Sequence, residues 1–247
     1  MAWYAYCITE HEALQNGARS RRPFPLTNLT GIHGAPVLGY TSGDFAVVVS
    51  EFKRQVALDQ KAALDHARVV SECFRMATIL PFRFATVFES DDALRRAVRT
   101  NRRAFLASLE RLRGKSEMHL KIILRDGTVK EAVAELELPA AVGAAYLSRL
   151  REKAIRDREC QTKARAVSVQ VHRLFNPLDE EVTCKKVESG RLLIDIAHLI
   201  DTKSLEIYQN RYNNATRQLK DCQLVISGPW PPYHFMPGKL RTVPGAN

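Results

Sequence analysis

The stretch CQLVISGPWPPYHF (residues 222–235) combines two different patterns. Cys222, Leu224 and Ile226 stand at alternate positions at its start, which predicts a short β-strand. Three prolines and three aromatic residues follow between Gly228 and Phe235. Because proline cannot donate a ladder hydrogen bond, such a stretch is tolerated at the end of an edge strand. We therefore expect an edge strand whose proline-rich end stops further pairing and leaves its aromatic side chains to fold back on the domain or to face a partner.

The elements expected before this strand complete a β-α-β-β-α-β order. Met118 to Leu124 alternates apolar and polar residues over most of a strand, and a long helical stretch follows from about Ala140 to Leu174. Two more strands form a hairpin around Ser189-Gly190, and an amphipathic helix precedes residue 222. This order is that of the split-βαβ or ferredoxin-like fold. We therefore predict a two-domain α+β protein whose C-terminal domain, residues 115–247, is modified ferredoxin-like with a long helical insertion.

Residues 1–114 predict an N-terminal domain of mixed strands and helices. Residues 3–9 are rich in aromatic residues, and two strand-like runs flank Ser42-Gly43-Asp44, which is typical of a hairpin. Apolar residues at spacings of three and four then predict a helix. We expect this helix to end near Leu80, because Pro81 disfavours helical geometry in the residue before it. Phenylalanines at alternate positions predict a strand over residues 82–88.

A second helix is expected in this domain, from a cap at Ser90 or Asp91 to Gly114. Its inner stripe consists of Leu94, Ala97 or Val98, Asn101, Phe105, Leu109 and Leu112. Seven arginines between Arg95 and Arg113, against the single Glu110, lie mostly on its other faces. Arginines can bind phosphates, so a basic nucleic-acid-binding regulator that uses this helix is the alternative function. No RNP1-like run accompanies it, and we favour a solvated face or an acidic protein contact over nucleic acid.

The net charge and the cysteines limit the class of protein to which the chain can belong. The net charge of +10 and the sequence pI of about 9.6 favour a polyanionic partner, although an arginine-rich surface that only serves solubility has the same charge. Five widely spaced cysteines without a C-x-x-C pair indicate reduced thiols in a cytoplasmic protein. The start lacks a signal-peptide pattern, and no apolar stretch approaches the roughly 18 residues of a membrane span. The oligomeric state stays open.

No pattern of catalytic or metal-binding residues is evident. The seven histidines are scattered, and the glycines fit neither a dinucleotide fingerprint nor a P-loop. Ser71 lies five residues after His66 and therefore on a different helical face. His66 belongs to the apolar stripe of its helix, so we interpret it as a structural core residue. We expect no enzyme activity, no cofactor and no metal.

Two motifs, taken together, resemble a known family. Ile79-Leu80-Pro81-Phe82-Arg83-Phe84-Ala85-Thr86-Val87-Phe88 resembles the central signature of the gas vesicle GvpL/GvpF family. Gly228-Pro229-Trp230-Pro231-Pro232-Tyr233-His234-Phe235 resembles the carboxy-terminal signature of the same family. Two further segments are similar to the usual sequence pattern of this family. They are Leu112-Arg113-Gly114 with Glu117, and His66-Ala67-Arg68-Val69-Val70 upstream. The resemblance therefore covers nearly the whole chain.

The resemblance implies an accessory protein needed for gas vesicle formation, without enzyme activity or cofactor. It implies association with the small hydrophobic shell protein and other vesicle accessory proteins, as a chaperone-like factor or a minor structural component. The candidate partner-binding or family-motif residues are Pro81, Phe82, Arg83, Phe84, Gly228, Pro229, Trp230, Pro231, Pro232, Tyr233 and Phe235. Their aromatic side chains can instead be core or strand-end packing, and the sequence leaves both interpretations open.

Three residues depart from the family's usual pattern. Ala85 stands where glycine is usual, His234 stands where serine is common, and Ala144 replaces a frequent basic residue. Each change is small, so we expect the fold to be kept. Whether partner contacts are retained at these points stays open.

Overall fold

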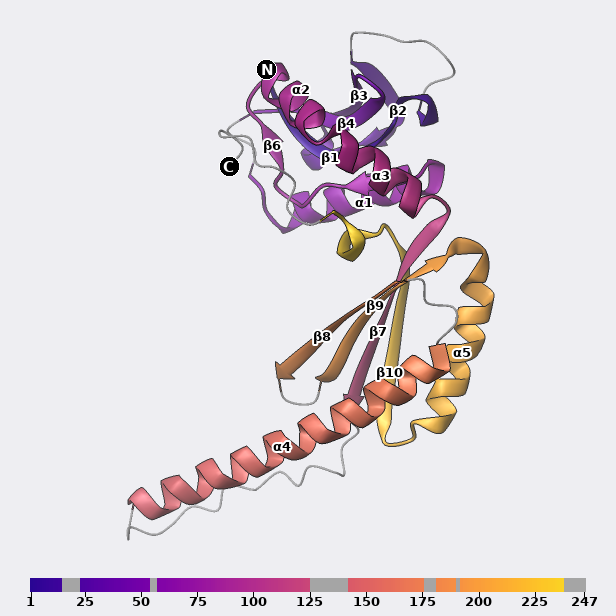
Figure 1. Cartoon of the computed structure of the whole chain (residues 1–247). Helices are drawn as coiled ribbons and strands as arrows, with labels where there is room; N and C mark the ends of the chain where they lie inside the picture. Colours follow the sequence, from indigo (N-terminus) through magenta and orange to yellow (C-terminus); the bar gives the residue numbers. More distant parts are fainter. Residues whose placement is uncertain (15–22, 54–56, 125–141, 176–180, 190–191, 238–247) are drawn as a thin grey trace. The chain divides into compact units, whose positions relative to one another are not determined.

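A computed structural model describes residues 1–14, 23–53, 57–124, 142–175, 181–189 and 192–237 (Figure 1). The chain divides into two compact units. Unit 1 comprises Met1–Glu117 together with the chain from Pro229, and unit 2 comprises Met118–Gly228. The predicted division after residue 114 lies close to the first of these boundaries. The segment from Pro229, which we had assigned to the C-terminal domain, belongs instead to unit 1, because side chains near residues 111–117 bind it as described below.

Unit 1 contains a sheet with the strand order β2-β3-β4-β1-β5, in which β6 also pairs with β1. Its strands are β1 (Ala2–Glu10), β2 (Phe24–Thr30), β3 (Pro36–Ser42), β4 (Phe45–Phe52), β5 (Ile79–Pro81) and β6 (Val87–Phe88). The predicted hairpin is confirmed, since Ser42 pairs with Phe45 across a two-residue turn in which Gly43 has φ +64°. Strand β1 pairs antiparallel with β4, β5 and β6, and it is therefore central to the sheet.

The helices of unit 1 cover both faces of this sheet. They are α1 (Gln60–Met76), α2 (Asp91–Thr100) and α3 (Arg102–Leu112), with short 3₁₀ turns at η1 (His11–Ala13) and η2 (Ile32–Gly34). Neighbouring residues of a strand point to opposite faces. Tyr4 of β1 contacts His66 of α1, whereas Trp3 donates a hydrogen bond to Asp91 of α2. Helix α1 thus lies on one face and α2 on the other, and the side chains from Trp3 to Thr9 are all buried.

Two predictions for unit 1 were wrong in detail. Helix α1 ends at Met76 and not near Leu80, because the chain is already extended at Ala77 and enters strand β5. Residues 82–88 form no continuous strand, because the chain turns between β5 and β6 and Ala85 adopts a positive φ of 68°. This turn, and not the alternation of the sequence, decides which way each phenylalanine points.

The predicted arginine-rich helix is present as two helices. The break lies at Asn101, whose side-chain amide and backbone N–H both bond to the carbonyl of Ala97. Ser90 caps α2 by accepting the N–H of Ala93 at 3.1 Å, and Gly114 follows α3 with φ +70°. The expected inner stripe is buried at Leu94, Val98, Asn101, Phe105, Leu109 and Leu112.

Unit 2 has the predicted β-α-β-β-α-β order of elements. They are β7 (Lys115–Leu124), α4 (Val142–Phe175), β8 (Glu181–Ser189), β9 (Leu192–Asp201), η3 (Thr202–Ser204), α5 (Leu205–Gln218) and β10 (Cys222–Trp230), and η4 (Tyr233–Phe235) follows in unit 1. Among the described strands the sheet order is β10-β7-β9-β8, which places β10 at an edge as expected. The predicted hairpin turn at Gly190 lies outside the described residues.

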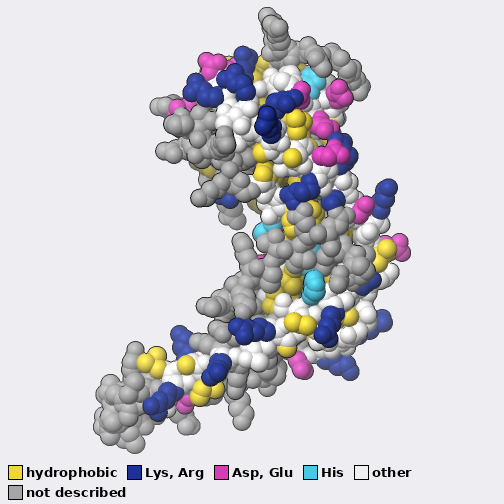
Figure 2. Space-filling model, viewed as in Figure 1, with side chains coloured by type: hydrophobic (Ala, Val, Ile, Leu, Met, Phe, Trp, Pro, Cys, Tyr) yellow, Lys and Arg dark blue, Asp and Glu magenta, His cyan; other side chains and the backbone are white. Residues whose placement is uncertain are grey.

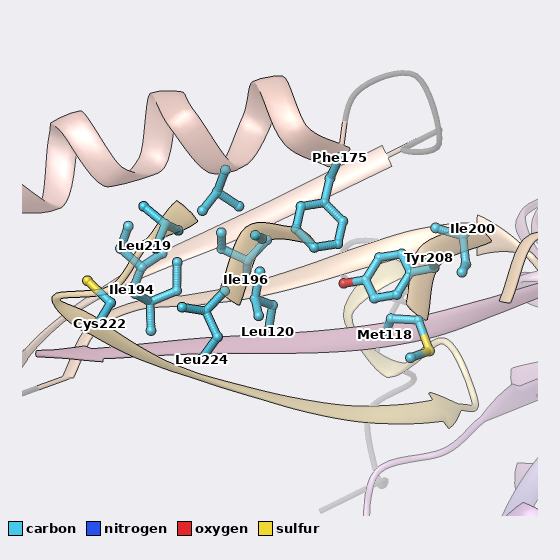
Figure 3. Packing of buried hydrophobic residues seen from close by; sticks show 13 residues of the cluster. Met118, Leu120, Phe175, Ile194, Ile196, Ile200, Tyr208, Leu219, Cys222 and Leu224 are labelled. Atoms are coloured by element: carbon cyan, nitrogen blue, oxygen red, sulfur yellow. The ribbon is translucent and has the colours of Figure 1, made fainter. Parts of the chain in front are cut away.

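The core of unit 2 forms where α4 and α5 pack on the sheet. It includes Met118, Leu120, Ile122, Val171, Phe175, Ile194, Ile196, Ile200, Tyr208, Ala215, Leu219, Cys222 and Leu224 (Figure 3). Helix α4 runs unbroken through 34 residues, and only its last turns contribute to this cluster. Its earlier part extends past the sheet and exposes Leu150 and Ile155 (Figure 1).

Three of the five cysteines, Cys7, Cys73 and Cys222, are buried with free thiols, as predicted for reduced cysteines. None of the helices in the described parts of the chain combines the length and the apolar character needed to cross a bilayer.

Candidate partner-binding site

The central motif forms a short loop that is anchored to β1 at both ends. Before the loop, the N–H of Phe82 donates to the carbonyl of Tyr6 at 2.9 Å. After it, the N–H of Ala5 donates to the carbonyl of Thr86 at 2.9 Å. Within the loop, the N–H and the hydroxyl of Thr86 both donate to the carbonyl of Arg83, at 3.2 and 2.7 Å. These bonds hold residues 83–86 as a defined turn on the edge of unit 1.

A buried hydrogen-bond network links this loop to strand β1 and helix α1. The Nε2 atom of His66 lies 3.2 Å from the carbonyl oxygen of Phe82, and its Nδ1 atom lies 2.9 Å from the hydroxyl of Tyr4. The N–H of Ala85 donates to that hydroxyl at 3.3 Å. A carbonyl only accepts, so Nε2 carries the proton, and Tyr4 donates to the bare Nδ1. Every polar group of this network is therefore satisfied when His66 is neutral.

Burial keeps His66 in that neutral form. It lowers the pKa of His66 to about 4. The hydrogen bond to the carbonyl of Phe82 raises the pKa, but this effect is smaller than that of burial. Burial likewise raises the pKa of Tyr4 to about 12, so its hydroxyl stays protonated. The prediction that His66 is a structural core residue is confirmed by its burial and its two internal partners.

The four candidate residues of the central motif are divided between core and surface. Pro81 and Phe82 are buried, and the ring of Phe82 lies edge-on to that of Phe88. Arg83 and Phe84 are exposed. The ring of Phe84 is 38% exposed, while its inner side contacts Tyr4 and His66. Core packing therefore explains Phe82 but not Phe84.

The carboxy-terminal motif shows a similar division. Pro231, Pro232 and Phe235 are buried, and the turn η4 is closed by a hydrogen bond from the N–H of Phe235 to the carbonyl of Pro232. Trp230 is 45% exposed and Tyr233 is 38% exposed. Gly228 has φ +130°, which only glycine adopts readily, and Pro229 beside it is exposed.

Two side chains of unit 1 hold this motif. Arg111 of α3 donates a hydrogen bond to the carbonyl of Phe235. The carboxylate of Glu117, only 1% exposed, accepts the backbone N–H of His234 at 2.8 Å and its Nδ1–H at 2.7 Å. Charge-assisted hydrogen bonds of this kind are stronger than neutral ones.

Tyr4 of β1 is linked to an aromatic residue of each motif, by a ring contact with Phe84 and by an electrostatic effect on Tyr233. The ring of Phe84 lies 6.5 Å from that of Tyr4. The pKa of Tyr233 is raised, chiefly by burial of its hydroxyl and then by the nearby Cys7, Tyr4 and Glu117. Each motif therefore combines buried residues with at least one aromatic ring that is partly exposed.

The surface of unit 1 carries many charges besides its exposed apolar side chains (Figure 2). Figure 2 shows apolar side chains between basic and acidic ones on the visible face of unit 1. The large apolar residues that the structure exposes in this unit include Leu64 and Met76 besides Phe84, Trp230 and Tyr233. The last three differ from the first two because they belong to the two motifs.

The arginines of α2 and α3 are largely used within unit 1. Arg95 donates to the hydroxyl of Tyr40, Arg102 pairs with Asp44, and Arg113 pairs with Glu10 and Glu110. Arg96, Arg99 and Arg103 are exposed. Most of the arginine-rich helix therefore stabilises the unit.

The family model described as "Gas vesicle synthesis protein GvpL/GvpF" matches residues 2–237. The chain belongs to the GvpL/GvpF family. Gas vesicle protein L of Streptomyces sp. (strain CB03234) is 28% identical over 184 residues, which is 70% of this chain and 68% of that protein. Gas vesicle protein F of the same strain is 24% identical over 238 residues, which is 89% of this chain and 96% of that protein.

Solved structures support the mixed α+β fold. GvpF from Anabaena sp. PCC7120 superposes with a TM-score of 0.72 at 16% identity, over 96% of this chain and 97% of that chain. GvpF from Microcystis aeruginosa gives a TM-score of 0.70 at 16% identity, over 96% and 99%. Membership of the GvpL/GvpF family makes this a protein involved in gas vesicle formation.

Several residues that build the site were not among the sequence candidates. Tyr4 and Arg111 carry no local signal, because their partners lie more than 60 residues away in the chain. The sequence indicates Glu117 only as part of the usual pattern of the family. Its carboxylate is buried, and because a buried charge requires partners, Glu117 is a structural anchor.

Proposed function

We propose that this protein binds the hydrophobic gas vesicle shell protein through the partly exposed rings of Phe84, Trp230 and Tyr233. The observation that carries the proposal is the division of both family motifs into a buried, hydrogen-bonded part and an exposed aromatic part. In this role it is a chaperone-like factor or a minor structural component, found in the cytoplasm and associated with vesicles, together with other accessory proteins.

The chemistry of the partner explains the use of aromatic side chains. A subunit that forms a hydrophobic wall exposes apolar surface and strand edges before assembly, and both promote aggregation. Aromatic residues offer large contact areas at a small cost in conformational entropy, and they are frequent among residues that dominate binding energy. Three such rings can cover part of a subunit and release it when the wall grows.

The supports of these rings favour binding without rearrangement. Phe84 lies against Tyr4 and His66, which are themselves fixed by hydrogen bonds. Tyr233 belongs to a 3₁₀ turn whose next residue is held by Glu117. Side chains that are already held in place lose less entropy on binding.

We also propose that the protein acts without catalysis. Two of the buried histidines, His66 and His198, bond to tyrosine hydroxyls, at 2.9 and 2.7 Å, and burial lowers the pKa of each to about 4. These are the properties of structural histidines rather than of general bases, whose pKa is typically near the working pH.

For unit 2 we infer a modified ferredoxin-like fold. The β-α-β-β-α-β order and the strand order β10-β7-β9-β8 support this classification. The 34-residue α4 is the expected helical insertion.

Co-purification with the shell protein tests the binding proposal. Tagged wild-type protein should retain co-expressed shell protein, whereas Phe84→Ala and Trp230→Ala should lose most of it. Leu64→Ala is the matched control, because Leu64 is 66% exposed on α1 and belongs to neither motif. Circular dichroism should show that all variants fold. Equal retention by all three variants, or no retention by the wild type, would refute the proposal.

A further inference from the structure

We propose that a groove between the β3–β4 turn and helices α2 and α3 binds an acidic segment of a partner polypeptide, with Arg99 as its main contact. The groove has a volume of about 480 Å³. It is lined by residues 41–45 on one side and by Arg95, Val98, Arg99 and Arg102 on the other. This site is separate from the motif aromatics and goes beyond the binding of the shell protein.

The helical spacing explains why three arginines meet the same groove. Arg95 and Arg99 stand four residues apart on α2, which places them on one side of consecutive helical turns, and Arg102 is the first residue of α3 after the break at Asn101. Arg96 and Arg103 do not line the groove. The positive charge of the groove is therefore set by three particular positions.

The two outer arginines are held in place by neighbouring groups. The Nε atom of Arg95 donates to the hydroxyl of Tyr40 at 2.7 Å, and its guanidinium lies over the Tyr40 ring at 5.6 Å. Arg102 donates to Asp44 with Nε at 2.7 Å and with Nη2 at 2.6 Å. The Arg102–Asp44 pair shows that a carboxylate already fits at one end of the groove.

The central arginine differs from these two. Within the part of the chain that the structure describes, no hydrogen bond or ion pair engages the side chain of Arg99. The hydroxyl oxygen of Thr41, another lining residue, is buried and also has no hydrogen-bond partner there. Buried polar groups are nearly always satisfied, so the Thr41 hydroxyl marks a polar position of the groove that lacks a partner, while the exposed guanidinium of Arg99 is free to pair with an anionic group.

The surroundings favour a carboxylate side chain over a phosphate backbone. Val98 and Phe45 are buried and give the groove an apolar part, which suits the methylene groups of a glutamate. Asp44 lines the groove, and its negative charge repels a dense row of phosphates. Because Asp44 pairs with Arg102, the guanidinium of the central arginine is left for a single carboxylate. An acidic peptide therefore fits the groove better than nucleic acid.

Fluorescence anisotropy with a labelled peptide of ten glutamates tests this assignment on the full chain. Arg99→Gln should weaken binding about five- to tenfold, as expected for the loss of one charge-assisted contact. Arg103→Gln is the control, because it removes the same charge from an exposed arginine outside the groove, and it should change the affinity less than about twofold. Asp44→Asn should strengthen binding, since it frees Arg102.

Three outcomes would overturn the proposal. They are no binding of the peptide, equal weakening by Arg99→Gln and Arg103→Gln, or tighter binding of a single-stranded oligonucleotide with the same dependence on Arg99. The last outcome would assign the groove to nucleic acid. Neither Arg99→Gln nor the peptide involves the motif aromatics, so capture of the shell protein can succeed or fail independently of this result.

Discussion

The carboxylate of Glu117 is fully enclosed and bonds to both the backbone N–H and the imidazole Nδ1–H of His234. This relationship joins the start of β7 to the carboxy-terminal motif. It also explains how His234 can stand where the family commonly has serine. Any residue except proline at 234 supplies the backbone N–H, and a short side-chain donor can replace the imidazole.

We predict that Glu117→Ala destabilises the protein far more than His234→Ala. Removing the carboxylate leaves buried donors without an acceptor, which costs about 1–3 kcal/mol or more for groups bonded to a charge. His234→Ala keeps the backbone bond and should cost about 1 kcal/mol. Urea unfolding of both variants measures the difference, and His234→Ser should lie between His234→Ala and the wild type. Equal losses in the two alanine variants would contradict the anchoring role of the carboxylate.

We predict that Ala85→Gly stabilises unit 1. Ala85 has φ +68°, a conformation that costs a residue with Cβ roughly 1–2 kcal/mol and glycine almost nothing. After the greater chain entropy of glycine in the unfolded state is subtracted, the gain should be about 0.5–1 kcal/mol. The control is Ala107→Gly on the exposed side of α3, which should destabilise by about 1 kcal/mol. Changes of the same sign in both variants would show that backbone strain at Ala85 is not the cause.

We predict that both units lose stability as the pH falls below about 6.5. Burial lowers the pKa of His66 in unit 1 and of His198 in unit 2 to about 4, below the ordinary value of 6.5. As the pH falls, the unfolded chain therefore binds these protons before the folded chain does. The contribution of the neutral histidines to the free energy of unfolding is fully present above pH 6.5 and declines as the pH falls toward 4. Between pH 7.5 and 5 the loss should be on the order of 2 kcal/mol per histidine.

Chemical unfolding at several pH values checks this dependence. The variant His66→Gln should show a smaller loss on acidification than the wild type, because glutamine does not titrate. An unfolding free energy that is flat between pH 7.5 and 5 would exclude neutral, buried histidines as the cause.

We predict that Gly31→Ala destabilises unit 1 by about 1–3 kcal/mol through overpacking. A Cβ atom at Gly31 would lie 2.2 Å from the hydroxyl oxygen of Tyr6 and 2.6 Å from the Oγ of Ser50. Those two oxygens bond to each other at 3.0 Å, and the hydroxyl of Tyr6 also accepts the N–H of Ile32, so neither is free to move.

A double-mutant cycle separates this clash from other effects. In a Tyr6→Phe background the nearest atom is absent, so Gly31→Ala should cost less than it does in the wild type. If the two substitutions add independently, the clash with the Tyr6 hydroxyl is not the reason for the loss.

Much of the fold follows from local periodicity. The stripe through His66, Val69 and Cys73 predicts the buried face of α1, and the stripe through Phe105, Leu109 and Leu112 predicts that of α3. The order of elements in unit 2 and the edge position of β10 were also predictable, because turns, caps and alternating residues mark each element within a few positions.

Local residue patterns are therefore enough to predict the order and type of most elements, the core faces of the helices and the two family motifs. They do not predict that Phe82 is buried while Phe84 is exposed, that Asn101 divides the arginine-rich helix, or that the segment from Pro229 joins unit 1. The physical reason is the distance along the chain over which the deciding contacts act. Hydrogen bonds such as those from Tyr4 to His66 and from His234 to Glu117 link residues 62 and 117 positions apart, and no pattern of neighbouring residues encodes them.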